Sequence, residues 1–109
     1  MDIDCLTPPM NELQTKLLLY SIENTNSTGE ISQYSIDDFK RRYSIAYQNE
    51  DFLSNDIESM IRLSFKSNGP KKLSITKLVS FVEYDEKNVL IEWNHDIKDF
   101  IQHEKEKMI

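Results

Sequence analysis

The spacing of the apolar residues changes along this chain, and that change most constrains its fold. Over most of the first 66 residues, apolar side chains recur at three- and four-residue steps, which places them on one face of a helix. From Leu73 to Tyr84 the chain is rich in β-branched and aromatic residues that alternate in part at two-residue steps, as strands require. The sequence therefore predicts an α+β fold in which helices pack on a β-hairpin.

The helical part contains three predicted helices and one short strand. The first helix covers residues 10 to 23, where an apolar stripe repeats with helical spacing. A short strand at residues 30 to 34 leads into Ser35-Ile36-Asp37-Asp38, a capping-box pattern that predicts a second, short helix. The third helix is expected at residues 50 to 66. The sequence Asn68-Gly69-Pro70, which follows, is expected to end it.

The remaining residues predict a hairpin followed by a last helix. Residues 73 to 84 form one strand, residues 85 to 88 form the turn, and the return strand alternates at Val89, Ile91 and Trp93. Asn94 then caps a helix whose apolar stripe contains Ile97, Phe100, Ile101 and Met108. A helix, a strand, two helices and a hairpin is the order of a winged-helix domain, so that topology is the prediction.

The predicted core combines the apolar faces of the helices with the inner side of the hairpin. Its centre is expected to contain Leu13, Leu17, Phe39, Leu53, Ile57, Ile61, Ile91 and Phe100. Burial of these side chains would make truncation of the third helix's apolar residues strongly destabilising.

Composition favours one domain of residues 1–109 with a protein partner. A single Cys5 cannot form an intrachain disulfide, which favours a reducing compartment and a cytoplasmic location. The longest apolar run, from Leu17 to Tyr20, is far shorter than the roughly 20 residues of a membrane helix, so no membrane partner is expected. Thirteen basic against nineteen acidic residues give a net charge of −6. A free-standing DNA reader normally carries a basic excess.

Residues that carry catalysis or bind metals are sparse. His95 and His103 are separated by eight residues, which on a helix is roughly 12 Å and too far to share one ion. Cys5 has no neighbouring base, and the only glycines, Gly29 and Gly69, form no phosphate-binding loop. The sequence therefore predicts no enzyme activity, no cofactor and no metal site.

Two clusters have more than one interpretation. Lys40, Arg41 and Arg42 are either the solvated side of an amphipathic helix or a set of contacts to phosphates. The aromatic residues of the hairpin, Phe81 and Trp93 among them, are either core residues of a small sheet or residues of an interface.

Three stretches carry a family resemblance. Leu6-Thr7 with residues 11 to 20 is similar to an opening helix with a Leu-rich turn, and residues 34 to 39 are similar to a short strand running into a capped helix. Residues 78 to 94 with Ile97 are similar to a hairpin and the helix after it. In this order they resemble the N-terminal domain of the initiator (Rep) proteins of theta-replicating plasmids, which have two winged-helix domains in tandem. Family members continue into the second domain at about the place where this chain stops.

The resemblance implies a regulatory function. In the family this domain mediates dimerisation; dimers repress the initiator's own gene, whereas monomers bind origin repeats, where the domain adds contacts to the DNA backbone. A homodimer through the hairpin would use Phe81, Tyr84, Val89 and Ile91 as candidate contacts. Within a longer initiator, origin DNA would be contacted by Lys40, Arg41, Arg42, Lys71 and Lys72. Host replication proteins are further partners in keeping with this family.

The alternative is a stand-alone winged-helix transcription regulator or a protein-interaction adaptor. Such a regulator needs a basic recognition helix. The third predicted helix contains Arg62 and Lys66, but also four acidic residues, namely Glu50, Asp51, Asp56 and Glu58. This helix therefore fits insertion into a DNA groove poorly.

Overall fold

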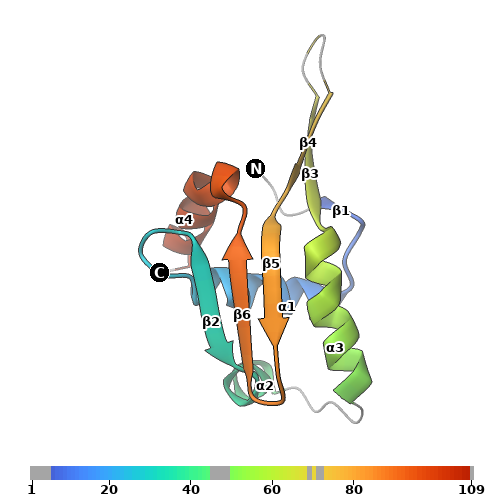
Figure 1. Cartoon of the computed structure of the whole chain (residues 1–109), viewed down its shortest axis with the longest axis vertical. Helices are drawn as coiled ribbons and strands as arrows, with labels where there is room; N and C mark the ends of the chain where they lie inside the picture. Colours follow the sequence, from blue (N-terminus) through green and yellow to red (C-terminus); the bar gives the residue numbers. More distant parts are fainter. Residues whose placement is uncertain (1–5, 45–49, 69, 71–72, 109) are drawn as a thin grey trace.

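A computed structural model of the chain describes residues 6–44, 50–68, 70 and 73–108 (Figure 1). The α+β class predicted from the sequence is confirmed. In chain order the elements are β1 (Leu6–Thr7), α1 (Glu12–Glu23), β2 (Ile31–Ser35), α2 (Ile36–Tyr43), α3 (Glu50–Ser59), η2 (Met60–Arg62), β3 (Ser64–Asn68), β4 (Leu73–Lys77), β5 (Val79–Tyr84), β6 (Asn88–Trp93), η3 (His95–Ile97) and α4 (Lys98–Glu106).

The strands form two separate antiparallel sheets. The first has the order β2-β6-β5, so the last strand of the chain lies at its centre. The second has the order β1-β3-β4. Figure 1 shows α1 crossing behind the first sheet, and β3 and β4 extending away from it as a narrow ribbon. The molecule measures 47 × 27 × 23 Å, and the ribbon lies along its longest dimension.

Helix α1 confirms the first predicted helix. Its cap is a reciprocal capping box: Asn11 Oδ1 accepts a hydrogen bond from the Gln14 N–H at 2.8 Å, and Gln14 Oε1 accepts one from the Asn11 N–H at 3.0 Å. Leu17, Leu18 and Ile22 are buried on the face that meets the sheet. The helical spacing of these residues is therefore the cause of both the helix and its orientation.

Helix α2 begins where the sequence predicted. Ser35 ends β2, and its hydroxyl accepts a hydrogen bond from the Asp38 N–H at 3.3 Å. Phe39 is fully buried and Tyr43 is partly buried, with their ring centroids 5.5 Å apart. Both rings also lie against Tyr20 of α1, so an aromatic cluster joins the two helices.

The third predicted helix ends earlier than expected, and this prediction was wrong for its last turn. Helix α3 and the turn η2 end at Arg62, whereas Ser64–Asn68 forms strand β3. Phe65 pairs with Thr76 of β4 and with Leu6 of β1. Ser64 and Phe65 follow Met60 and Ile61 at the four-residue spacing of a helix. Their backbone N–H and C=O groups are satisfied by pairing with strands rather than by bonds within a helix.

The predicted strand at residues 73 to 84 is two strands in different sheets. Strand β4 pairs with β3, and β5 pairs with β6. The break falls at Leu78, which is fully buried. Its N–H donates to the Leu63 carbonyl at 3.2 Å, and its carbonyl accepts from the Asn94 N–H at 2.8 Å. The chain therefore passes from the second sheet to the first at Leu78, a buried residue.

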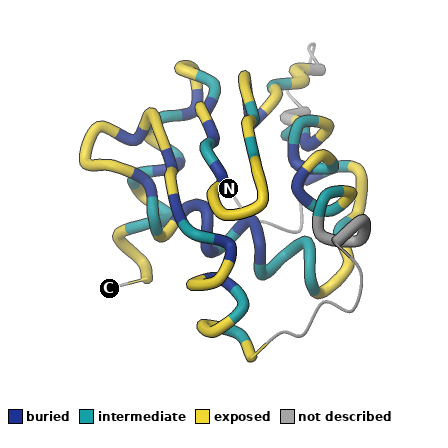
Figure 2. The backbone as a smooth tube through the Cα atoms, turned by 60° about the horizontal axis from the view of Figure 1, so that its bottom comes forward, coloured by how far each residue is buried: buried dark blue, intermediate teal, exposed yellow. Residues whose placement is uncertain are grey.

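The hairpin itself is confirmed as β5 and β6. The Asp85 carboxylate closes its turn by accepting hydrogen bonds from the backbone N–H groups of Lys87 and Asn88, at 2.7 and 2.8 Å. In β6, buried positions alternate with more exposed ones. Figure 2 colours the backbone by burial and shows buried, intermediate and exposed residues along it. After β6, Asn94 caps η3 before α4 begins. Met108 is 37% exposed and, contrary to expectation, lies outside the buried stripe of this helix.

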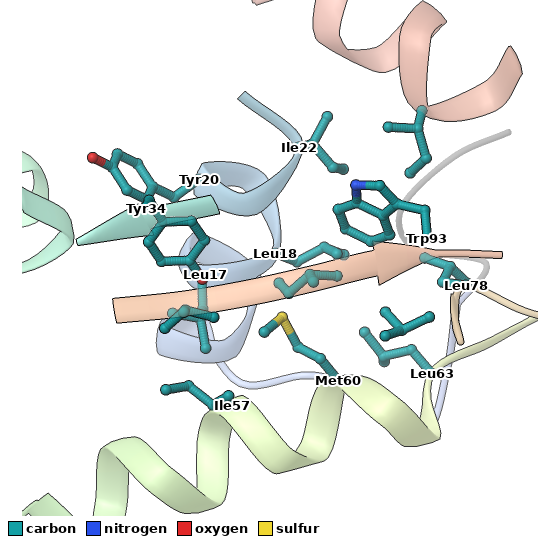
Figure 3. Packing of buried hydrophobic residues seen from close by; sticks show 14 of the residues in the cluster. Leu17, Leu18, Tyr20, Ile22, Tyr34, Ile57, Met60, Leu63, Leu78 and Trp93 are labelled. Atoms are coloured by element: carbon teal, nitrogen blue, oxygen red, sulfur yellow. The ribbon is translucent and has the colours of Figure 1, made fainter. Parts of the chain in front are cut away.

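The core contains half of the residues predicted for it. Leu17, Phe39, Ile57 and Ile91 are at most 1% exposed, whereas Leu13, Ile61 and Phe100 are partly buried, and the side chain of Leu53 lies outside the described residues. The predicted centre omitted Leu18, Ile22, Met60, Leu63, Leu78, Trp93 and Ile101, all of which are buried (Figure 3 labels most of them). The predicted apolar stripe of the last helix does contain Ile101, and a core position is one of the two interpretations of Trp93. Trp93 is a core residue whose Nε1–H donates to the buried Thr25 hydroxyl at 2.9 Å.

Candidate functional site

The basic cluster of α2 lies in the last turn of that helix, where cations suit the negative end of the helix dipole. Arg41 forms an ion pair with Asp38 of the preceding turn. The guanidinium of Arg42 lies 5.2 Å from the centroid of the Tyr43 ring, within range of a cation–π contact. Because α2 also contains two acids, its net charge is only +1. The cluster is therefore a weaker electrostatic feature than its sequence indicates.

Lys40 lies apart from the two arginines, beside a depression of about 270 Å³ between α2, α3 and the β5-β6 turn. The depression is lined by Ile36, Lys40, Ser54, Ile57, Tyr84, Asp85 and Glu86. Hydrogen bonds from two backbone N–H groups lower the pKa of Asp85. Donation to the Glu58 carboxylate at 2.6 Å raises the pKa of Tyr84. Both shifts move these groups further from neutral pH, and both interactions stabilise the local fold.

The face of the first sheet that is turned away from α1 is open to solvent. We call it the outer sheet face. The register of the strands places Ile31, Glu92 and Phe81 side by side in one row. The next row contains Gln33, Leu90 and Glu83. Ile31 is 40% exposed and Phe81 is 44% exposed. A hollow of about 540 Å³ is lined in part by Ile31 and Glu92 of the first row, and one of about 430 Å³ is lined in part by the second row. The outer sheet face thus combines large uncovered apolar side chains with glutamates.

The predicted dimer contacts are only partly available on this face. Val89 and Ile91 are at most 1% exposed, which contradicts their role as contacts, because the alternation of β6 turns them toward α1. Tyr84 is partly buried and bonded to Glu58 of α3, so this end of β5 is flanked by a helix. Phe81 remains the exposed candidate. The hairpin therefore exposes its outer face at Phe81, whereas α3 flanks the Tyr84 end of β5.

Strands β3 and β4 form a second exposed feature, which we call the β-arm. Beyond the two residues that pair with β1, it is a ribbon of two strands. Lys66 lies opposite Ile75, and Lys77 lies next to them on the same face. All three side chains are exposed, Ile75 by 58%. On the other face, Phe65 packs against the core.

Sequence reasoning missed the β-arm because residues 64 to 66 were assigned to a helix. Asn68-Gly69-Pro70 is a turn signal, and Asn68 pairs with Leu73 across the two strands, so a turn between two strands was an interpretation that the sequence allowed. Lys71 and Lys72, two of the predicted DNA contacts, lie outside the described residues.

The two histidines are exposed and lie on different elements, His95 in η3 and His103 in α4. Within the part of the chain that the structure describes, no group of three or more His, Cys, Asp or Glu residues is arranged to hold a metal ion. Cys5 lies outside that part. Over the same residues, no helix has the length and apolar character needed to cross a membrane.

Comparison with known proteins adds no family assignment. The chain matches no protein-family model and no curated protein sequence. Functional interpretation therefore depends on the outer sheet face, the β-arm and α2.

Proposed function

We propose that this chain is the N-terminal winged-helix domain of a plasmid replication initiator, which associates with a second copy and adds contacts to the DNA backbone at the origin. The observation that carries the proposal is the outer sheet face, where Ile31 and Phe81 are exposed and Leu90, in the next row, is partly exposed. Uncovered apolar side chains gathered on one face are typical of interaction surfaces. The strand order β2-β6-β5 is compatible with a winged-helix topology and supports the same proposal.

A second copy of the chain is the partner that this face fits. A two-fold dimer brings the same patch of both copies together, so Ile31, Phe81 and Leu90 of one copy would cover their counterparts. Glu83 and Glu92 lie in the same rows and would approach the glutamates of the partner. Like charges at an interface repel, and salt screens that repulsion. The dimer should therefore become tighter as the ionic strength rises.

Sedimentation velocity of the chain between 10 and 500 μM, in buffers of low and high salt, tests this proposal. We expect a dimer that forms at micromolar concentrations and is favoured by salt. Phe81→Glu should weaken it at least tenfold because it adds a charge at the centre of the apolar contact. Ile75→Glu is the matched control, since Ile75 is more exposed than Phe81 and lies on the β-arm. A chain that remains monomeric at several hundred micromolar contradicts the proposal.

The alternative of a stand-alone regulator or adaptor also fits an exposed sheet face. Reading the natural coding sequence past Ile109 distinguishes the two. A second winged-helix domain there supports the initiator, whereas a stop codon supports the regulator or adaptor.

A further inference from the structure

Positive charge is concentrated in one part of this acidic chain. Residues 59 to 82 contain five of the thirteen basic residues and none of the nineteen acidic ones. Elsewhere eight basic residues face nineteen acidic ones, a net charge of −11. This segment contains η2 and the whole β-arm. The net charge of −6 is therefore the sum of +5 on this segment and −11 on the rest of the chain.

The basic side chains of the arm are free to meet a ligand. Lys66 and Lys77 lie on one face of the ribbon with Ile75 between them, and Arg62 is exposed at the base of the arm. The ion pairs that the structure shows among its described residues involve other lysines and arginines, on α1, on α2 and at the end of α4. None of these ion pairs includes Arg62, Lys66 or Lys77.

The cations of the arm lie near its base and its middle. Lys77 lies opposite Ser64, which also pairs with β1, whereas Lys66 lies opposite Ile75, one residue beyond the part of the ribbon that β1 covers. Because residues 59 to 82 contain no acidic residue, the neighbours of these cations along both strands are uncharged or basic. The local charge of the arm is therefore positive, although the net charge of the chain is −6.

We infer that the β-arm is the element of this chain that contacts nucleic acid, with its basic face against the phosphates of duplex DNA. Arg62, Lys66 and Lys77 each neutralise a phosphate, and Ile75 makes apolar contact with the groove wall. A two-stranded β-ribbon is one of the elements that fit the major groove. The inference rests on the proposed function for its partner, DNA, and assigns the contact to the β-arm.

The basic cluster of α2 is the competing site, and its surroundings favour it less. Arg41 is paired with Asp38, and Arg42 lies over the Tyr43 ring. Lys40 is partly buried beside a depression that Asp85 and Glu86 also line. A phosphate approaching α2 would meet these carboxylates, whereas the segment that forms the β-arm contains no carboxylate side chain.

Fluorescence anisotropy of the intact chain with a labelled 20-base-pair duplex of arbitrary sequence, between 50 and 200 mM NaCl, tests the inference. Each neutralised phosphate contributes about −0.9 to the slope of log affinity against log salt, so three contacts predict a slope of about −2.7 or steeper. Lys66→Glu/Lys77→Glu should weaken binding at least tenfold and make the slope shallower by about 1.8.

Arg41→Glu/Arg42→Glu is the matched control, because it changes the net charge by the same amount on α2. We expect it to change the affinity less than threefold. Urea unfolding of each variant should establish that both remain folded. Loss of binding through the α2 variant alone, or equal loss through both, overturns the assignment to the β-arm and leaves the proposed function in place.

Two further results separate the inference from the proposed function. If the natural chain binds no duplex at 50 mM NaCl while it still forms the dimer, the DNA contact is wrong and self-association stands. If polyglutamate displaces the duplex at equal charge concentration, the arm selects acidic polymers in general and the assignment to DNA is overturned. Displacement by a competing duplex but not by polyglutamate supports the inference.

Discussion

Ile57→Ala is the substitution that most sharply tests how α3 packs. Ile57 is fully buried, and the change removes three carbon groups, each contributing about 0.8 kcal/mol when it is transferred from water. That transfer contribution is roughly 2.4 kcal/mol, and the cavity that remains adds to it, so the expected loss of unfolding free energy is about 2 to 5 kcal/mol. Urea unfolding measures it, provided that the denaturant dependence stays the same as in the natural chain.

Ile75→Ala is the matched control for this measurement. The chemical change is identical, but Ile75 is more than half exposed on the β-arm. Only its preference for a strand is lost, which costs at most about 1 kcal/mol. A loss below about 0.5 kcal/mol for Ile57→Ala, or equal losses for the two variants, would refute the packing of α3 described above.

Two further predictions concern the caps and turns. Asn11→Ala removes the acceptor of the α1 capping box and should lower the unfolding free energy by about 1 kcal/mol, whereas Asn11→Asp should retain most of it; thermal unfolding of both variants measures the difference. The folded-state pKa of Asp85 is lowered, so its charge contributes stability above its unfolded-state pKa of about 4, and that contribution is lost as the pH falls through the folded-state value. Asp85→Asn should therefore lose less stability than the natural chain between pH 6 and pH 3, and a carboxyl NMR titration that finds an ordinary pKa for Asp85 contradicts this reasoning.

Helices and strands whose caps and apolar spacing are both present in the local sequence were predictable. Asn11 and Ser35 each precede an apolar stripe with helical spacing, and both cap helices in the structure. The alternation of β6 was equally informative, because one of its faces is buried against the helices and the other is open. In these segments, local preference and tertiary packing favour the same conformation.

Elements that depend on long-range pairing were not predictable in the same way. Ser64 and Phe65 fit a helix by spacing, and only their pairing with β1 and β4 makes them a strand. The break at Leu78 depends on hydrogen bonds to Leu63 and Asn94, which are distant from it in sequence. A pattern of apolar residues in a single sequence contains no information on such partners.

The candidate sites also combine residues that local sequence indicates with residues that only strand pairing brings together. Phe81 is the exposed member of the four predicted dimer contacts, whereas Val89 and Ile91 are buried. Ile31 and Leu90 join it only through the register of β2 and β6, which the sequence does not specify. Likewise, Lys66 and Lys77 lie eleven residues apart in the chain and share a face because β3 pairs with β4. Both surfaces are products of strand pairing.

Self-association through the outer sheet face is tested by isotope-filtered NOE spectroscopy of a mixture of labelled and unlabelled chains. We predict cross-peaks between the two copies at Phe81, Leu90 and Ile31, at concentrations where sedimentation shows the dimer. Cross-peaks between copies that are confined to the β-arm or to α2, with none from the outer sheet face, would contradict it.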